Sequence, residues 1–109
     1  MTSKKPAVIK RTNLPRAADY TKEFQKDWIR LSHSGRYNMI RLKEVMLLLI
    51  SNEGPLPPEW LDHPLTGDWA GYRECHIGGD FLLIYTIGDL VKNSLIVFVR
   101  SGTHSDLFS

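Results

Sequence analysis

Hydrophobic and polar residues alternate with a helical period in the first half of the chain and a strand-like period in the second. Over residues 17–32, one apolar stripe recurs at helical spacing: Tyr20, Phe24, Trp28 and Leu31. This spacing predicts an amphipathic helix whose aromatic stripe faces the core, and Gly35 is a natural stop after it. A second helix is predicted over residues 36–51. Because its second half, VMLLLI, is apolar all round, we expect it to be buried on more than one side.

Three strands are predicted after a proline-rich loop, over residues 72–77, 81–87 and 94–100. The middle one, FLLIYTI, is apolar on both faces, which is typical of a central strand. Short connections between the strands favour an antiparallel meander, and a weak alternation over residues 7–13 predicts an edge strand before the helices. The predicted order is strand, helix, helix and three strands. This order indicates an α+β fold in which a two-helix hairpin packs on one face of an antiparallel sheet.

The 109 residues suit a single domain, with residues 1–10 as an extension. Cys75 is the only cysteine, so no disulfide framework is possible. No apolar run is long enough to cross a bilayer and no secretory signal is present, so we expect a cytoplasmic protein without a membrane partner.

Positive charge is concentrated in the first half of the chain. From Lys4 to Lys43 there are eleven lysines or arginines and three acids, although the net charge is only +2. Such an asymmetry is compatible with a polyanionic or acidic partner, and equally with two ordinary solvated helix faces.

The stretch LDHPLTGDWAGYRECHIGGD, residues 61–80, has most of the candidate chemistry. It begins as a loop with His63 and runs into the strand that contains Glu74 and His76. Because side chains alternate along a strand, Glu74 and His76 share one face, and Arg73 and Cys75 share the other. Glu74 and His76 are therefore close enough to hydrogen-bond.

Three interpretations of the histidines remain open at this point: a metal site, structural histidines, or a general acid–base site. No spacing matches the short-range ligand pairs of common zinc motifs, so a metal is not favoured. No serine lies in a nucleophile elbow, and Cys75, in the middle of a strand, is better explained as a small buried residue than as a nucleophile.

Two long motifs, LPPEWLDHPLTGDWAGYRECHIGGDFLLIY and RSGTHSDLF, resemble the YafQ branch of the RelE/ParE toxin superfamily. The resemblance covers about half of the chain, and the predicted order of elements agrees with the RelE-like fold. It implies a ribosome-dependent mRNA endonuclease, the toxin of a type II toxin–antitoxin system, which needs no cofactor. The implied partners are a cognate antitoxin, the ribosome and its mRNA, with operator DNA bound through the antitoxin.

The resemblance also assigns residues by position. The implied catalytic residues are His63, His76, Asp80, Arg100 and His104, and the implied substrate contacts are Arg73, Glu74 and Phe108. The family often has aspartate at the position of Glu74. A metal-free cleavage would use the ribose 2′-OH as the nucleophile, which requires a base, an acid and a cation for the extra phosphate charge. We expect His104 as the acid, Asp80 or His63 as the base, and Arg100 with His76 as the stabilising groups, while Phe108 stacks on a base of the RNA.

Two alternatives remain open. One is a ParE-like toxin, which shares the fold, lacks the acid–base set and inhibits DNA gyrase. The other is an inactive relative that is retained as a partner of its antitoxin.

Overall fold

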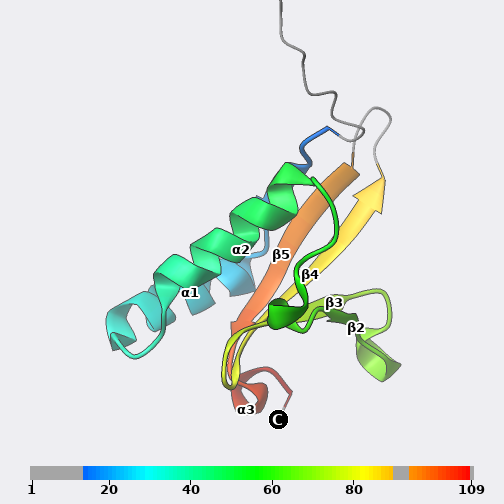
Figure 1. Cartoon of the computed structure of the whole chain (residues 1–109). Helices are drawn as coiled ribbons and strands as arrows, with labels where there is room; N and C mark the ends of the chain where they lie inside the picture. The colour runs from blue at the N-terminus through cyan, green and yellow to red at the C-terminus, as the bar shows by residue number, and fades with distance from the viewer. Residues whose placement is uncertain (1–13, 90–93, 109) are drawn as a thin grey trace, which may run out of the picture.

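The computed structural model describes residues 14–89 and 94–108 and shows a five-stranded sheet with helices packed on it (Figure 1). The strand order is β1-β5-β4-β3-β2, with β1 parallel to β5 and the other neighbours antiparallel. The main elements are β1 (Ala17–Tyr20), α1 (Lys22–Ser34), α2 (Met39–Ser51), β2 (His63–Pro64), β3 (Arg73–Gly78), β4 (Phe81–Asp89), β5 (Ser94–Gly102) and α3 (His104–Phe108). Two single turns of 3₁₀ helix, η1 (Pro58–Trp60) and η2 (Gly67–Trp69), lie in the loop before β3.

The predicted α+β fold is confirmed, with α1 and α2 on one face of the sheet. The sheet is not antiparallel throughout, because β1 is parallel to β5, and the first helix begins later than predicted. Residues 17–20 form the edge strand β1, because β5 supplies them with parallel backbone partners. The helix starts after Thr21, whose hydroxyl accepts a hydrogen bond from the Phe24 N–H at 2.9 Å. Gly35 ends it in the left-handed conformation, as predicted. Tyr20 therefore leaves the helical stripe and is exposed. The strand predicted over residues 7–13 lies outside the described residues.

The second helix begins at Met39, three residues later than predicted, after Asn38 caps its first turn. The expectation that its apolar half is buried on more than one side is wrong. One face packs into the core through Leu42, Val45 and Leu49, whereas Leu47 is 65% exposed and Leu48 is also exposed. The sheet covers only one side of this helix, so the leucines on its other side are not covered by apolar side chains of the described residues.

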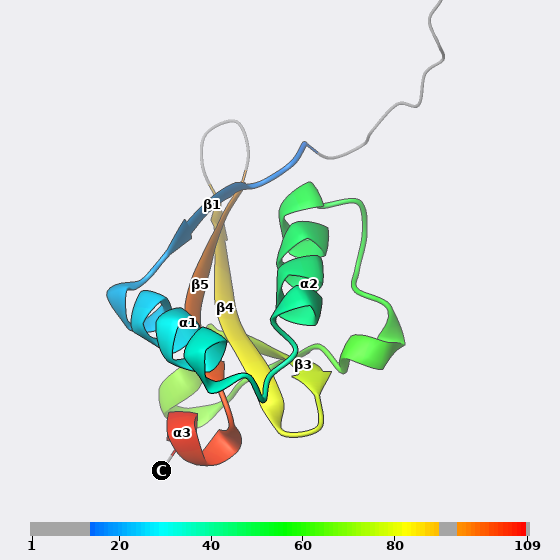
Figure 2. The ribbon, with the colours of Figure 1, turned by 90° about the vertical axis from the view of Figure 1, so that its left-hand side faces the viewer.

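Strand β4 lies between β3 and β5, so the prediction of a central strand is confirmed. Its alternate residues face two different layers. Phe81, Leu83 and Tyr85 join the large core beneath α1 and α2, which lie together on one face of the sheet (Figure 2). Leu82 and Ile84 belong to a smaller cluster on the opposite face, with Leu107 of α3. The candidate histidines come from the elements that border this second layer.

The chain ends in a short helix, α3, which the sequence patterns did not predict. Thr103 and Asp106 cap it reciprocally: the Asp106 N–H donates to the Thr103 hydroxyl at 3.2 Å, and the Thr103 N–H donates to Asp106 Oδ2 at 3.1 Å. Gly102 makes this possible, because a Cβ there would lie 2.9 Å from Asp106 Oδ2. None of the described helices is long and apolar enough to cross a membrane.

Candidate active site

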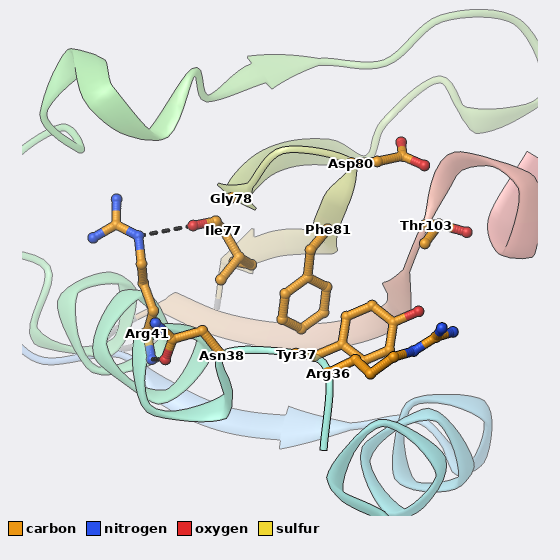
Figure 3. Close-up of a pocket in the computed structure, with 9 residues that line it drawn as sticks. All are labelled: Arg36, Tyr37, Asn38, Arg41, Ile77, Gly78, Asp80, Phe81 and Thr103. Atoms are coloured by element: carbon orange, nitrogen blue, oxygen red, sulfur yellow. Dashed lines mark hydrogen bonds between the residues drawn. The ribbon is translucent and has the colours of Figure 1, made fainter. Parts of the chain in front are cut away.

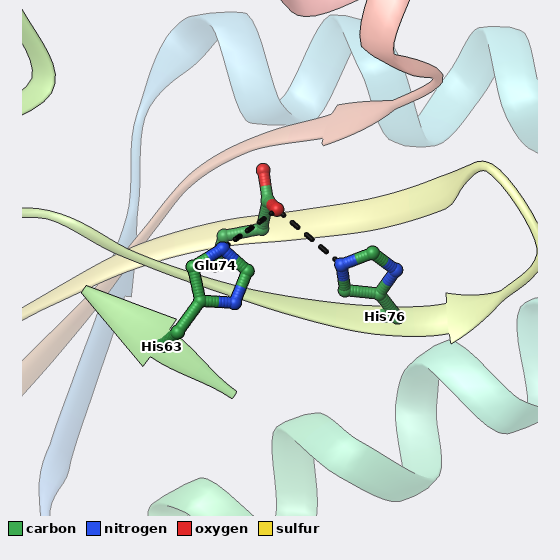
Figure 4. A group of neighbouring side chains, drawn as sticks. All are labelled: His63, Glu74 and His76. Atoms are coloured by element: carbon green, nitrogen blue, oxygen red, sulfur yellow. Dashed lines mark ion pairs between the residues drawn. The ribbon is translucent and has the colours of Figure 1, made fainter. Parts of the chain in front are cut away.

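Glu74 is the centre of a histidine cluster built on β2 and β3 (Figure 4). His76 is two residues further along β3, on the same face, as the alternation predicts. His63 is directly opposite Glu74 in the register between β2 and β3. Glu74 Oε2 lies 3.2 Å from His63 Nε2 and 3.4 Å from His76 Nε2. The two imidazole ring centroids are 5.9 Å apart.

The third histidine of the cluster comes from the tail. His104 is the first residue of α3, and its Nε2 lies 4.0 Å from the same Glu74 oxygen. The ring centroids of His76 and His104 are 6.2 Å apart. The structure therefore brings together three histidines that are far apart in sequence, around a single carboxylate oxygen.

Glu74 is buried, with only 3% of its surface exposed. Its other carboxylate oxygen, Oε1, is also buried and has no hydrogen-bond partner among the described residues. Burying an ionised carboxylate is unfavourable unless cations or donors face it. Imidazole N–H groups that face Oε2 can provide part of that compensation.

A backbone contact fixes the orientation of the His63 ring. His63 Nδ1 lies 2.8 Å from the Leu61 carbonyl oxygen. A carbonyl can only accept, so Nδ1 holds the hydrogen and Nε2 is the nitrogen left to exchange a proton. Leu61 has a left-handed backbone with φ of 49°, which is uncommon for a leucine. This strained residue directs its carbonyl to His63.

Asp80 fixes the orientation of His104 in a similar way. Its Oδ1 lies 2.5 Å from His104 Nδ1 and accepts the His104 backbone N–H at 3.3 Å. These hydrogen bonds lower the pKa of the Asp80 carboxyl below its usual value. Since Nδ1 donates to a carboxylate, Nε2 of His104 is free to exchange a proton, and it points to the Glu74 side of the cluster.

Aromatic rings continue the site beyond His104. Phe108 lies 5.8 Å from the His104 ring and 5.7 Å from the Trp69 ring, measured between centroids. Trp69 also packs edge-on against Tyr72, with centroids 5.3 Å apart. Sequence reasoning identified Phe108 but assigned no role to Trp69. Trp69 does lie in the DHPLTGDW motif, and this was the only signal that could have indicated it.

The structure does not bring the two arginines into contact with the histidines. Arg100 is paired with Asp27 of α1, with Nε 2.7 Å from Oδ2, and this ion pair raises the pKa of its guanidinium. Arg73 lies 2.7 Å from Asp62, which also accepts a hydrogen bond from the Tyr85 hydroxyl. The two arginines thus have structural partners among the described residues, and neither acts as a free cation beside Glu74.

Cys75 is fully buried on the opposite face of β3, and this burial raises the pKa of its thiol. The interpretation as a small core residue is confirmed.

His63, Glu74 and His76 have ligand atoms within 4.8 Å of one another. Two imidazole nitrogens and a carboxylate oxygen form a donor set that copper or zinc accepts. The geometry could therefore hold a transition metal, although the spacing along the chain does not match a zinc motif.

The sequence and the fold of this chain are similar to those of known proteins. The model of the family described as "Bacterial toxin of type II toxin-antitoxin system, YafQ" matches residues 16–109. The chain belongs to the YafQ toxin family. It is 41% identical over 95 residues to the mRNA interferase toxin YafQ of Escherichia coli K12, covering 87% of this chain and 98% of that protein.

Solved structures of YafQ toxins show the same fold. The toxin in the E. coli DinJ–YafQ toxin–antitoxin complex is 41% identical and superposes with a TM-score of 0.75, covering 88% of this chain and 100% of that one. A copper-bound mutant toxin from Helicobacter pylori is 41% identical, with a TM-score of 0.72, covering 85% of this chain and 99% of that one.

Proposed function

We propose that this YafQ-family protein is an endoribonuclease that cleaves mRNA in the A site of the ribosome and so inhibits translation. The observation that supports this best is the convergence of three histidines and Asp80 around buried Glu74, beside the exposed ring of Phe108. The E. coli relative is named an mRNA interferase. A cluster of positioned proton donors and acceptors is what phosphodiester cleavage through the ribose requires.

The proposed reaction uses the RNA itself as the nucleophile. A base removes the proton of the 2′-OH, and O2′ attacks the adjacent phosphorus. The bond to the 5′ oxygen breaks, and an acid gives that oxygen a proton. The products are a 2′,3′-cyclic phosphate and a 5′-hydroxyl end. No metal takes part in these steps.

The geometry favours particular residues for these roles. His104 is suited to be the acid, because Asp80 holds its Nδ1 and leaves Nε2 free. Both candidate bases have a partner: Asp80 Oδ1 is engaged by His104, and His63 Nε2 lies 3.2 Å from Glu74 Oε2. We propose His63 as the base through Nε2, because Glu74 would stabilise the imidazolium that forms. His76, which shares that carboxylate, would supply positive charge to the phosphorane.

The proposed roles of Arg100 and Arg73 are less well supported. Arg100 forms an ion pair with Asp27. To stabilise the phosphorane, it would have to break this ion pair, or act from a longer distance while the Asp27 carboxylate offsets part of its positive charge. Arg73 donates to Asp62 through Nε and Nη2, so its Nη1 group is left for a contact with substrate. Phe108 keeps its proposed stacking role, because its ring is exposed next to His104.

A cognate antitoxin is the proposed protein partner, because E. coli YafQ forms a complex with DinJ. The outward face of α2 supports this proposal. Ile40, Leu47 and Leu48 are exposed there, and Ile40 is 78% exposed. Exposed apolar residues that gather on one helix face are typical of protein interfaces. In this proposal the antitoxin covers this face and links the complex to operator DNA, while the basic helices of the free toxin contact ribosomal RNA.

A transition metal would compete with the proposed reaction. Copper or zinc held by His63, Glu74 and His76 would occupy the groups that exchange the proton. We expect Cu²⁺ or Zn²⁺ to inhibit cleavage, and protein that is treated with EDTA and then freed of it to cut at the full rate. Measuring cleavage of ribosome-bound mRNA against metal concentration tests this, and a lower rate with protein that was stripped of metal before the assay would contradict the metal-free steps.

The proposed function is tested by removing the acid. Purified His104→Ala protein should cut ribosome-bound mRNA about 10²–10⁴-fold more slowly than wild type. His33→Ala is the matched control, since His33 is an exposed histidine of α1 that lies outside the cluster, and it should cut at the wild-type rate. A His104→Ala protein with unchanged activity would overturn the acid assignment.

Expression in cells separates the alternative functions. An immediate halt in translation supports the nuclease. Normal translation with filamentation and DNA damage would instead support a ParE-like gyrase inhibitor. A wild-type protein that is harmless when expressed alone would support an inactive relative that only binds its antitoxin.

A further inference from the structure

A second concave site adjoins the histidine cluster, on the side where α2 begins. It is a pocket of about 430 Å³ between the start of α2, the β3–β4 hairpin and the residue before α3 (Figure 3). This volume is within the range of roughly 300–1,000 Å³ that is usual for ligand sites. The proposed cleavage reaction uses none of its lining residues except Asp80.

The pocket is continuous with the proposed active site through two residues. Asp80 lines the pocket and also accepts the hydrogen bonds of His104. Thr103 lines it as well and directly precedes His104. A strand of RNA with its scissile phosphate at His104 therefore has this pocket as an immediate neighbour.

The two arginines of the pocket differ in whether their side chains have partners. Arg41 is committed: its Nε donates to the Ile77 carbonyl at 2.7 Å, its guanidinium lies 4.0 Å from the Trp60 ring centroid, and it faces Glu59. Arg36 is exposed, and its guanidinium has no hydrogen bond or ion pair to any other described residue. It is thus a cation at the pocket that lacks an anion within the described part of the chain.

An aromatic ring stands beside this free cation. Tyr37 is half-buried and packs on Phe81, with ring centroids 4.9 Å apart. In Figure 3, the side chains of Arg36 and Tyr37 extend toward the same side of the pocket, where Thr103 lies. A guanidinium with an adjacent ring matches the two recurring features of a nucleotide, a phosphate and a base with a flat face.

We propose that this pocket binds a nucleotide of the mRNA that flanks the cleaved bond, with Arg36 on its phosphate and Tyr37 against its base. The inference rests on the proposed nuclease function and extends it to substrate binding. Arg36 and Tyr37 are binding residues in this scheme and take no part in proton transfer.

The experiment measures RNA binding by fluorescence anisotropy with the full-length protein. The probes are single-stranded oligonucleotides of three to six residues with 2′-O-methyl riboses, which lack the nucleophile and cannot be cut. Arg36→Ala should weaken binding about tenfold and reduce the dependence of log K on log salt by about 0.7, the value for one phosphate contact on a single strand. Tyr37→Leu should weaken binding about tenfold with no change in that salt dependence, whereas Tyr37→Phe should keep the wild-type affinity.

Lys26→Ala is the matched control, because Lys26 is an exposed cation of α1 outside the pocket. It should leave the affinity for these short RNAs unchanged. The loss in the Arg36→Ala protein should appear only with oligonucleotides long enough to reach from the cluster into the pocket. Far-UV circular dichroism and the melting temperature of each variant exclude a folding defect as the cause.

The outcomes separate this inference from the proposed function. If wild type cuts mRNA but Arg36→Ala binds RNA with the same affinity and salt dependence, the pocket proposal is wrong and the nuclease stands. An Arg36→Glu protein that loses affinity only for the antitoxin would overturn the proposal as well, because the pocket would then belong to a protein interface. If wild type neither cuts mRNA nor binds the oligonucleotides, it is the proposed function that fails.

Discussion

Two buried carboxylates of this protein have opposite surroundings. Asp27 of α1 is 4% exposed and Glu74 of β3 is 3% exposed. Asp27 Oδ2 accepts bonds from the Arg100 side chain and from the Ser101 N–H, and Oδ1 accepts from Arg30. In Glu74, one oxygen faces three histidines and the other has no partner.

The difference distinguishes a structural acid from one that is suited to chemistry. β1 pairs with β5 only as far as Phe98, so the backbone of β5 beyond that residue needs other partners. Asp27 provides one and ties α1 to this strand. Its partners are two guanidinium groups and a backbone donor, which form charge-assisted hydrogen bonds with it. The partners of Glu74 are imidazoles, which can both donate and accept a hydrogen, so its environment changes when a proton moves.

Glu74→Gln should have the largest effect, and the effect should be on activity. Glutamine is similar in size but cannot balance imidazolium charges, so the rate of mRNA cleavage should fall about 100-fold. The melting temperature should be unchanged or higher, because a buried acid with an orphan oxygen is replaced by a neutral group. Glu44→Gln, at an exposed acid of α2, is the control and should match wild type in both measurements. A strongly destabilised Glu74→Gln protein would show that Glu74 is structural as Asp27 is.

Asp27→Asn should show the reverse pattern. The amide cannot balance Arg100 and Arg30, so the free energy of unfolding should fall by about 2–4 kcal/mol, measured by urea denaturation. Cleavage at a temperature where the variant is fully folded should stay within a few-fold of wild type. A 100-fold loss of cleavage in folded Asp27→Asn protein would show that the position of Arg100 matters to the reaction, as the family resemblance implies.

The sequence was informative where local pattern decides the outcome. The alternation in β3 placed Glu74 and His76 together, and the apolar run of β4 identified the central strand. The sequence was not informative where contacts with residues distant in the chain decide the structure. Residues 17–20 have a helical apolar spacing, yet parallel pairing with β5 makes them a strand. Whether Leu47 is buried depends on which side of α2 meets the sheet, and no periodicity shows this when all sides are apolar.

The prediction of the candidate site was limited in the same way, because contacts between residues distant in sequence could not be predicted. Motif resemblance assigned its histidines, and the structure shows that His63, His76 and His104 converge. Their common partner Glu74 was ranked only as a substrate contact, because burial cannot be read from its position in the motif. The pairing of Arg100 with Asp27 joins residues that are 73 positions apart, and neither composition nor spacing links them.

Asp80 offers a third acid for the comparison and the smallest expected effect. It is 57% exposed at its side chain, so neither burial nor a permanent cation controls it; its main partner is His104. Its pKa is lowered from the ordinary 3.8 in the folded protein, so ionised Asp80 contributes stability above that value, and the contribution is lost as the pH falls through the folded pKa. Asp80→Asn should therefore melt slightly below wild type at pH 5, and the difference should shrink as the pH falls below 3.8.

The difference in melting temperature between wild type and Asp80→Asn, followed by calorimetry from pH 5 downwards, tests this. The matched variant Asp68→Asn changes an exposed acid of η2 and should give no such pH-dependent difference. Melting temperatures of wild type and Asp80→Asn that are equal at every pH would mean that the negative charge of Asp80 does not contribute to holding His104. In that case the asparagine amide would hold the His104 ring equally well, and the acid of the proposed reaction would not need a carboxylate beside it.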